Sequence, residues 1–340
     1  MSTSSPTSKR HKHYEIAITM GDPAGIGPEI ICRALSAMSA AERASTVVVG
    51  DPGILRRASA STGANDLAFV SLEQAEHSED SVAVAAVEVP SGVVIPDGEI
   101  SASAGDMAFR CVQKAVELVQ AGHAQVIVTA PLNKAALHEA GHHYDGHTGM
   151  LASLTGAPSS FMLLASETLS TLHVSTHVSL REAIERVTPE RIIATVEAGH
   201  AHLIALGTRE PRIAVAGLNP HCGEGGIFGD EDSRCIAPAV ERLRQRGFDV
   251  SGPISADTVF YRASQGEFDL VIAQYHDQGH IPVKLIAFDT TVNVSLGLPL
   301  QRTSVDHGTA FDIAWQGRAD ATNMASAIAY ARRLASGAAL

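Results

Sequence analysis

The amino-acid sequence predicts a two-domain α/β/α protein whose sheets are mostly parallel and are covered by helices on both faces. Short runs rich in β-branched residues alternate along the chain with longer segments whose apolar residues recur at helical spacing. With 340 residues, the chain is also longer than a single minimal hydrophobic core requires. Its hydrophobic content of 45% and charged content of 18% are ordinary for a folded, water-soluble protein.

The predicted strands are short and mostly apolar, and a helical pattern follows each of the first three. Strands are expected at residues 15–20, 46–50, 125–130, 171–176, 212–218 and 269–274. Helices are expected at residues 30–38, 52–61, 104–122, 133–141, 179–187 and 233–247. The helix at 104–122 is the clearest, because its apolar residues keep helical spacing and it ends on a glycine.

Charge, cysteine content and hydropathy exclude several classes of protein. The net charge of −12 argues against general nucleic-acid binding, which requires a basic surface. The four cysteines form no CxxC pair, as expected for a reduced, cytoplasmic protein. No apolar run approaches the ~18 residues of a membrane-spanning helix, so no membrane partner is expected. Residues 1–14 lack the apolar stretch of a signal peptide and are predicted to be a disordered tail.

Polar side chains follow the carboxyl ends of five predicted strands. Ligands of open α/β sheets bind beyond these strand ends, so the five clusters are expected to assemble a single site. In chain order they are Gly21 with Asp22, Asn133 with Lys134, His177, Asn219 with His221, and His276 with Asp277.

Three of these strand ends carry a histidine. His177, His221 and His276 could bind one divalent metal ion and leave coordination positions open for substrate or water. The gaps between them have no diagnostic spacing, and among 16 histidines a given one is more often a surface or core residue. The residues alone therefore leave both interpretations open.

A second group of side chains suits an anionic ligand. His147 and Thr148 lie in a predicted turn, and Lys284, Asn293 and Arg302 follow later in the chain. Two cations together with imidazole, hydroxyl and amide groups fit around a phosphate or a carboxylate. A solvated loop would explain each residue taken alone, so the interpretation depends on the group being assembled.

Several long motifs run in order from about Ile16 to the last predicted helix. They are ITMGDPAGIGPEI, TAPLNK, DGHT, GLNPHCGEGG, SADTVF, YHDQGHIPVK and VNVSLGLPLQRTSVDHGTAFDIA. Together they closely resemble the 4-hydroxythreonine-4-phosphate dehydrogenase family of pyridoxal phosphate biosynthesis. The resemblance implies a fold like that of the isocitrate and isopropylmalate dehydrogenases. It also implies a homodimer whose active sites lie in the domain cleft and use residues of both subunits.

The resemblance suggests where the two domains divide, although no linker in the sequence marks the boundary. The first α/β domain, on the cofactor side, is expected to comprise residues 15–130 plus 290–340. The second, which would carry the metal and the dimer contact, is expected at residues 131–289.

The resemblance also implies a metal set and catalytic groups. His177, His221 and His276 match the family's metal ligands, and an all-imidazole set favours zinc, with magnesium or cobalt as alternatives. Asp257 and Lys284 are the two candidates for the catalytic base, between which geometry must decide.

The substrate and cofactor residues follow from the same resemblance. The family's substrate shell maps onto His147, Thr148, Lys284, Asn293 and Arg302. The segment SVDHGTAFDIA resembles an adenosine-binding segment, which places His307 at the adenine and Asp312 at the ribose. A carboxylate at the ribose favours NAD over NADP, because it would repel a 2′-phosphate.

The implied reaction is the oxidation of the 3-hydroxyl of a small 4-phosphorylated 3-hydroxy acid, followed by decarboxylation. The motif YHDQGHIPVK contains two further residues of interest. Asp277 is expected to orient a ligand or base, and His280 is expected to lie behind a ligand or at the surface.

Three alternatives remain at this point. The turn reads GHTGM, with Gly149 where the family's biosynthetic enzymes carry an acid, and AGHHYDGHT resembles a sister branch that oxidises 4-phosphorylated threonate or erythronate. A more distant branch oxidises cis-dihydrodiols of aromatic acids, although the retained GHT and RTSVDHGT favour a phosphate. A zinc hydrolase without redox chemistry would use the three histidines but would not need the segment DHGTAFDIA.

Overall fold

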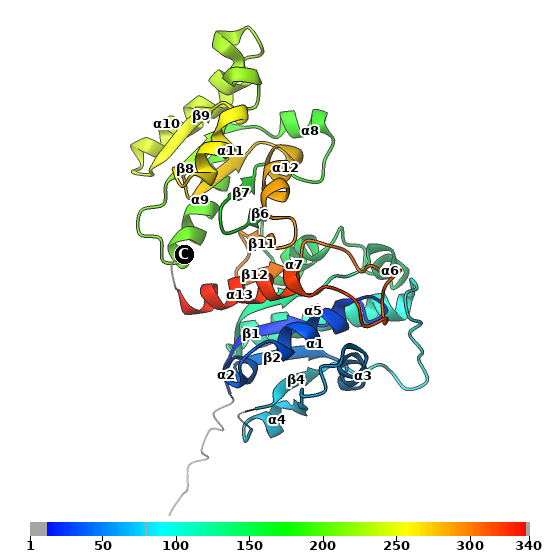
Figure 1. Cartoon of the computed structure of the whole chain (residues 1–340). Helices are drawn as coiled ribbons and strands as arrows, with labels where there is room; N and C mark the ends of the chain where they lie inside the picture. Colours follow the sequence, from blue (N-terminus) through cyan, green and yellow to red (C-terminus); the bar gives the residue numbers. More distant parts are fainter. Residues whose placement is uncertain (1–11, 79, 338–340) are drawn as a thin grey trace, which may run out of the picture.

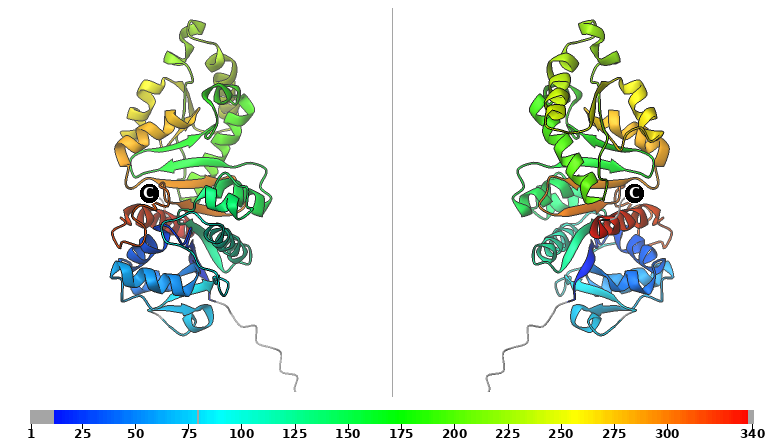
Figure 2. Two further views of the ribbon diagram at one scale, coloured as in Figure 1. Left: turned by 90° about the vertical axis from the view of Figure 1, so that its right-hand side faces the viewer. Right: turned by 90° about the vertical axis from the view of Figure 1, so that its left-hand side faces the viewer.

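The computed structural model describes residues 12–78 and 80–337. Residues 1–11 of the predicted tail lie outside the described residues, and Tyr14 already belongs to the first strand. The strands of the described chain form one twelve-stranded sheet in the order β3-β4-β2-β1-β5-β12-β11-β6-β7-β10-β8-β9. The sheet runs through the whole elongated molecule, with helices on both sides of it (Figures 1 and 2).

The strands are short, as their sequences predict. Their bounds are β1 Tyr14–Thr19, β2 Thr46–Gly50, β3 Phe69–Ser71, β4 Val82–Ala86, β5 Ala124–Thr129, β6 Phe161–Ala165, β7 Ser170–His173, β8 Ile213–Ala216, β9 Val250–Ile254, β10 Leu270–Ala273, β11 Val292–Leu296 and β12 Gln301–Ser304. Eight of the eleven strand pairings are parallel, and the three antiparallel ones join β12, β11, β6 and β7. The predicted α/β class with a mostly parallel sheet is therefore confirmed.

The helices are distributed along the whole chain. Their bounds are α1 Gly27–Ser36, α2 Ala40–Ala44, α3 Pro52–Thr62, α4 Leu72–Ala75, α5 Ala102–Gln120, α6 Lys134–Glu139, α7 His147–Thr155, α8 Leu180–Glu185, α9 Pro189–Ala205, α10 Ala237–Gln245, α11 Ala256–Ser264, α12 His276–Ala287 and α13 Thr322–Ser336, with a 3-10 turn η1 Pro220–Gly226 and a π-helical turn η2 Asp232–Ile236. Within the described residues, no helix has both the length and the hydropathy needed to cross a bilayer.

The central strands are buried on both faces, which explains their continuous apolar sequences. In β1, Ile16, Ala17 and Ile18 are fully buried, as are Val47, Val48 and Val49 of β2. Helices α5 and α13 both pack against β1 and β5, and they lie on opposite sides of the sheet (Figure 2). All six predicted strands and all six predicted helices are present, with ends shifted by a few residues.

Strands from both proposed domains belong to the same sheet. β5 pairs with β12 on one side of the middle, and β11 pairs with β6 on the other. Nothing in this continuous sheet fixes where one domain ends, so the boundaries at residues 130 and 290 stay a prediction. The antiparallel pair β11 and β12 brings residues 292–304 to the centre of the molecule, where the polar clusters gather.

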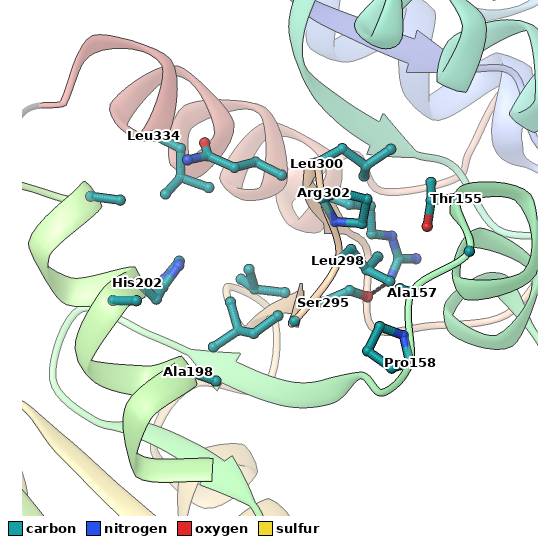
Figure 3. Close-up of a pocket in the computed structure, with 18 residues that line it drawn as sticks. Thr155, Ala157, Pro158, Ala198, His202, Ser295, Leu298, Leu300, Arg302 and Leu334 are labelled. Atoms are coloured by element: carbon teal, nitrogen blue, oxygen red, sulfur yellow. Dashed lines mark hydrogen bonds between the residues drawn. The ribbon is translucent and has the colours of Figure 1, made fainter. Parts of the chain in front are cut away.

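An apolar cavity of about 590 Å³ lies between α9, α13 and the connection from β11 to β12. Figure 3 shows Ala198 and His202 of α9 on one side and Leu334 of α13 on another, with Leu298 and Leu300 across the space from them. Of the predicted site residues, Arg302 borders this cavity, and the predicted metal and cofactor residues do not.

Candidate active site

Three hollows adjoin one another near the carboxyl ends of β7 and β10. Their volumes are about 600, 480 and 640 Å³, and His177 lines all three. The first hollow, here called the histidine hollow, also contains His276, Lys284 and Asn293. The third, here called the phosphate hollow, contains further predicted substrate residues, which are His147, Thr148, Asn293 and Arg302. The structure thus brings eight of the eleven predicted site residues to these adjoining hollows, counting His307, which lines the phosphate hollow.

Helix α12 positions His276 directly after strand β10. The sequence analysis did not predict this helix, because Gly279 and Pro282 are poor helix formers. His276 is its first residue, and its Nδ1 lies 2.7 Å from Oδ1 of Asp277. A carboxylate accepts a hydrogen bond from Nδ1–H, which leaves the Nε2 lone pair of His276 for a ligand. Asp277 therefore lies where it can orient a ligand.

His177 and His276 lie close together. Their ring centroids are 5.6 Å apart, and both rings border the histidine hollow. Burial lowers the pKa of His177, and the nearby Lys134 and His276 charges lower it further. A lowered pKa favours the neutral imidazole, which is the form that binds a metal ion.

His221 lies elsewhere. It belongs to η1, where His221, Cys222 and Glu224 all have positive φ, and its Nδ1 is 3.8 Å from Oδ2 of Asp257. Neither His221 nor Asp257 lines the hollows that His177 shares. Within the described residues, no three His, Cys, Asp or Glu side chains lie close enough to hold a metal ion. One copy of the chain therefore brings two of the three predicted ligands together.

The phosphate hollow is built around a buried guanidinium. Arg302 is 3% exposed and donates to Thr129 Oγ1 at 2.6 and 3.0 Å and to Ser295 Oγ at 3.0 Å. Among the described residues no carboxylate pairs with it. Burial lowers the pKa of Arg302 to about 9. A buried cation with only neutral partners is costly unless an anion completes its environment.

His147 and Thr148 begin helix α7 beside this guanidinium. The Nε2 atom of His147 is buried and has no hydrogen-bond partner, and Thr148 Oγ1 lies 3.3 Å from Ser295 Oγ. Burial, followed by the charge of Arg302, holds the pKa of His147 well below its usual range. The unpartnered nitrogen and the helix N-terminus both suit a bound anion.

Lys284 and Asn293 lie at the junction of the two hollows. Lys284 Nζ is 2.7 Å from Oδ2 of Asp306, and Asp306 and Asn293 line both hollows. Oδ1 of Asn293 is buried without a hydrogen-bond partner. An amide and an ammonium group therefore face the space between the histidines and Arg302.

The predicted cofactor residues follow β12. His307 lines the phosphate hollow, whereas Asp312 is exposed and does not line it. The same segment packs against the turn between β1 and α1, because Ile26 N–H donates to the Thr309 carbonyl at 3.0 Å. The buried carboxylate of Glu29 accepts hydrogen bonds from the backbone N–H groups of Trp315 and Gly317 at 2.6 and 2.7 Å.

Sequence reasoning missed several residues of the site. Asp306, Ser295 and Thr129 bind the predicted cations, and His173 and His280 lie behind His276. His280 is 7% exposed, so its predicted surface position is wrong and its predicted position behind a ligand fits. Lys134, predicted only as part of a strand-end cluster, lines the phosphate hollow.

Comparison with known proteins identifies the family. Residues 42–331 match the family model of pyridoxal phosphate biosynthetic protein PdxA. The chain is 46% identical over 326 residues to D-threonate 4-phosphate dehydrogenase of Pectobacterium atrosepticum, covering 94% of this chain and 99% of the relative. The chain belongs to the PdxA family. It is also 45% identical to 4-hydroxythreonine-4-phosphate dehydrogenase of Geobacter metallireducens, covering 94% and 95% of the two chains.

Solved structures of PdxA relatives share the fold. A 4-hydroxythreonine-4-phosphate dehydrogenase from Klebsiella pneumoniae superposes with a TM-score of 0.85 at 46% identity, covering 95% of this chain and 99% of that one. A terephthalate 1,2-cis-dihydrodiol dehydrogenase from Burkholderia xenovorans gives a TM-score of 0.68 at 31% identity, covering 97% and 100%. The predicted family is therefore confirmed, and its relatives carry more than one substrate name.

Proposed function

We propose that this PdxA-family chain is a dehydrogenase that oxidises the 3-hydroxyl of a 4-phosphorylated hydroxy acid and then releases CO₂. The observation that carries the proposal is the phosphate hollow, in which Arg302 and His147 lie in the same space as His177. A phosphate held at Arg302 and His147 would direct the other end of a four-carbon acid toward the histidine hollow. Binding energy from that remote phosphate would position the reacting carbon.

We propose D-threonate 4-phosphate, or the related erythronate compound, as the substrate. Gly149 lies in α7 on the wall of the phosphate hollow, and a Cβ at this position would meet nothing within 4 Å. The glycine is therefore not required by packing, and the position carries no acid that could bind an ammonium group. Of the carboxylates in this hollow, Asp306 is paired with Lys284, which leaves Asp145. The absence of an acid at position 149 is what favours a 2-hydroxyl over a 2-amino group.

The alternative substrate is 4-hydroxythreonine 4-phosphate, whose oxidation would place the chain in pyridoxal phosphate biosynthesis. The hollow that binds the phosphate would serve both substrates, since they differ at C2. Only residues near C2 can therefore distinguish the two substrates. Position 149 is the candidate for this role.

The donor set fits a divalent transition metal, with zinc preferred over magnesium or cobalt. His177 and His276 would hold it, since both imidazole rings lie on the wall of the histidine hollow. A bound metal would stabilise negative charge on the 3-hydroxyl oxygen and on the neighbouring carboxylate.

We further propose that a second copy of the chain supplies His221 and Asp257. The outer face of α12, next to the histidine hollow, exposes Ile281, Leu285, Ile286 and Phe288 at 57, 81, 48 and 69%. An apolar helix face of this kind is typical of a protein interface. A homodimer would cover it and would bring the missing imidazole beside His177 and His276.

NAD is the proposed cofactor, because His307 lines the phosphate hollow and the exposed Asp312 follows it on the same segment. The nicotinamide would accept the hydride from C3. A carboxylate near the ribose favours NAD over NADP.

The chain's own residues would bind and orient the substrate. Arg302, His147 and Thr148 would bind the phosphate, and Asn293 would donate to or accept from the hydroxyl groups. Lys284 would lie nearest the reacting carbon, where its ion pair with Asp306 could give way to a hydrogen bond with the substrate. Asp257 of the second copy is the other candidate for the base that takes the hydroxyl proton.

The experiment that tests the proposal supplies D-threonate 4-phosphate, NAD and Zn²⁺ or Mg²⁺ and follows NADH by absorbance and CO₂ by trapping. Equal amounts of NADH and CO₂ are expected, and both should disappear after removal of the metal by a chelator. Full activity after chelation would overturn the metal assignment, and CO₂ without NADH would overturn the redox reaction.

The shared site has its own test. His177→Ala and His221→Ala should each be inactive, and mixing them should restore about a quarter of the activity, because half the dimers then contain one intact site. Unmixed dimers of each variant provide the control. No recovery on mixing, with subunit exchange verified, would show that the ligands come from one copy.

A further inference from the structure

A row of three imidazoles runs from the sheet to the histidine hollow. His173 Nδ1 lies 2.9 Å from the carbonyl oxygen of Met162, and His173 Nε2 lies 3.0 Å from Nδ1 of His280. The ring of His280 stacks on that of His276, with centroids 3.6 Å apart and planes inclined by 15°. His173 belongs to β7, and His276 and His280 lie one turn apart on α12.

The hydrogen bonds in this row have a fixed direction. A carbonyl oxygen only accepts, so Nδ1 of His173 carries its proton and its Nε2 is an acceptor. Nδ1 of His280 must then donate to His173 Nε2, and it also lies 3.0 Å from the carbonyl oxygen of His276. The Met162 carbonyl therefore determines the tautomer of His173, and through it that of His280.

Gly279 makes this contact possible. A Cβ at Gly279 would lie 2.3 Å from Nε2 of His173 and 2.9 Å from Cβ of Ala273. Glycine in a helix interior is less favourable than alanine, so its presence here is explained by the close approach of the two elements. The backbone of α12 can thereby lie directly against the His173 ring.

We infer that His173 and His280 are positioning residues that hold the imidazole of His276 in its ligand orientation. Asp277 sets the tautomer of His276 through Nδ1, and His280 fixes its ring plane and its backbone carbonyl. Groups that orient a ligating histidine typically contribute roughly 10–100-fold to metal affinity. The inference rests on the proposed metal site, and it adds two residues that act through His276.

The test uses two substitutions of His280. One keeps an aromatic ring that can stack on His276, and the other keeps a hydrogen-bond donor. His280→Phe keeps a ring that can stack on His276 but cannot donate to His173. His280→Asn keeps a donor at the position of Nδ1 but loses the aromatic ring. A third variant, Gly279→Ala, displaces the His173 ring and leaves every imidazole present. His200→Phe is the matched control, because His200 of α9 makes an edge-to-face contact with Phe248 and lines none of the hollows described.

Two readouts are needed. Co²⁺ affinity of the full-length protein, measured by chelator competition, should fall roughly 10-fold or more in His280→Phe and Gly279→Ala. It should fall less in His280→Asn and stay unchanged in His200→Phe. The nitrogen NMR signals of His276 in the metal-free protein should show one ring environment in the wild type and more than one in His280→Phe, because the His276 carbonyl then loses its donor. A circular dichroism spectrum and melting temperature establish that each variant is folded.

The outcomes separate the two claims. Wild-type Co²⁺ affinity in His280→Phe, or nitrogen signals of His276 that are unchanged in that variant, would overturn the positioning role. If the wild-type protein binds no Co²⁺ at all, the metal assignment of His276 fails. The nitrogen signals of the metal-free protein then decide the positioning role independently.

Discussion

Lys284 Nζ and Asp306 Oδ2 lie 2.7 Å apart and join helix α12 to the segment after β12 across the opening of the site. Their side chains are 32 and 15% exposed, so the pair is largely shielded. Lys284 belongs to the second proposed domain and Asp306 to the first. This ion pair therefore links the two proposed domains at the wall of the site.

Replacing Lys284 by Met should lower kcat by about 100-fold or more, as expected for a group that transfers or orients the reacting proton. Steady-state kinetics of NADH formation measure the effect. Lys114→Met is the matched control, because Lys114 pairs only with Glu117 on the surface of α5 and should leave the kinetics unchanged. A Lys284→Met enzyme with wild-type kcat would remove Lys284 from the chemistry.

Replacing Arg302 by Met should abolish binding of the substrate phosphate while affecting stability little. The buried guanidinium has neutral partners in Thr129 and Ser295, so its removal relieves a desolvation cost. Inorganic phosphate should raise the melting temperature of the wild type and not that of the variant. Arg212→Met, at an exposed ion pair with Asp269, is the control that should still respond to phosphate.

The free energy of unfolding should fall as the pH is lowered from about 6.5 to 4. Burial lowers the pKa of His173 and His202 to about 4 and of His280 to about 3, and the pKa of His147 lies well below its usual range. In this window the unfolded chain binds protons that the folded chain does not, so acid favours unfolding. Asp22 opposes the trend, because burial raises its pKa to about 6 and the folded chain binds that proton more tightly.

Chemical denaturation at several pH values measures this dependence. His202→Gln should lower the slope by about one proton, or ~1.4 kcal/mol per pH unit, because His202 lies apart from the active site and bonds to Tyr330. A stability curve that is flat between pH 6.5 and 4 would contradict the burial of these four imidazoles in neutral form.

Introducing an acid at Gly149 should change the preference between the two substrates. Gly149→Glu places a carboxylate in the phosphate hollow without displacing any neighbour of the Cβ. The ratio of kcat/KM should shift by about 10-fold or more toward 4-hydroxythreonine 4-phosphate, since one charged hydrogen bond contributes roughly 1.5–3 kcal/mol. Gly149→Gln has the same length without the charge and should shift the ratio much less.

The sequence predicted the elements whose pattern is local. β2, with its run of three valines, has the predicted bounds, and α5 was predicted to within two residues at each end. Strands β11 and β12 were not predicted, although Asn293 and Arg302 on them were identified as site residues. These strands are stabilised by pairing with β5 and β6, which are distant in the sequence.

The sequence likewise predicted individual residues of the site but not the contacts between them. Residues that belong to recognisable motifs, such as His147 and Arg302, were identified, whereas the hydrogen bonds of Arg302 to Thr129 and Ser295 depend on the pairing of distant strands in the sheet. For His280 the sequence left a position behind a ligand and a surface position open, because the helix that buries it contains Gly279 and Pro282, which argue against a helix in a sequence. The separation of His221 from His177 and His276 has no counterpart in the sequence, since it depends on how distant elements assemble.

The most direct test of this account is the ratio of kcat/KM for D-threonate 4-phosphate and 4-hydroxythreonine 4-phosphate, measured side by side with NAD and Zn²⁺. The account predicts a ratio clearly in favour of the hydroxy acid. A ratio in favour of the amino acid would contradict the proposed role of Gly149 and would place the chain in pyridoxal phosphate biosynthesis.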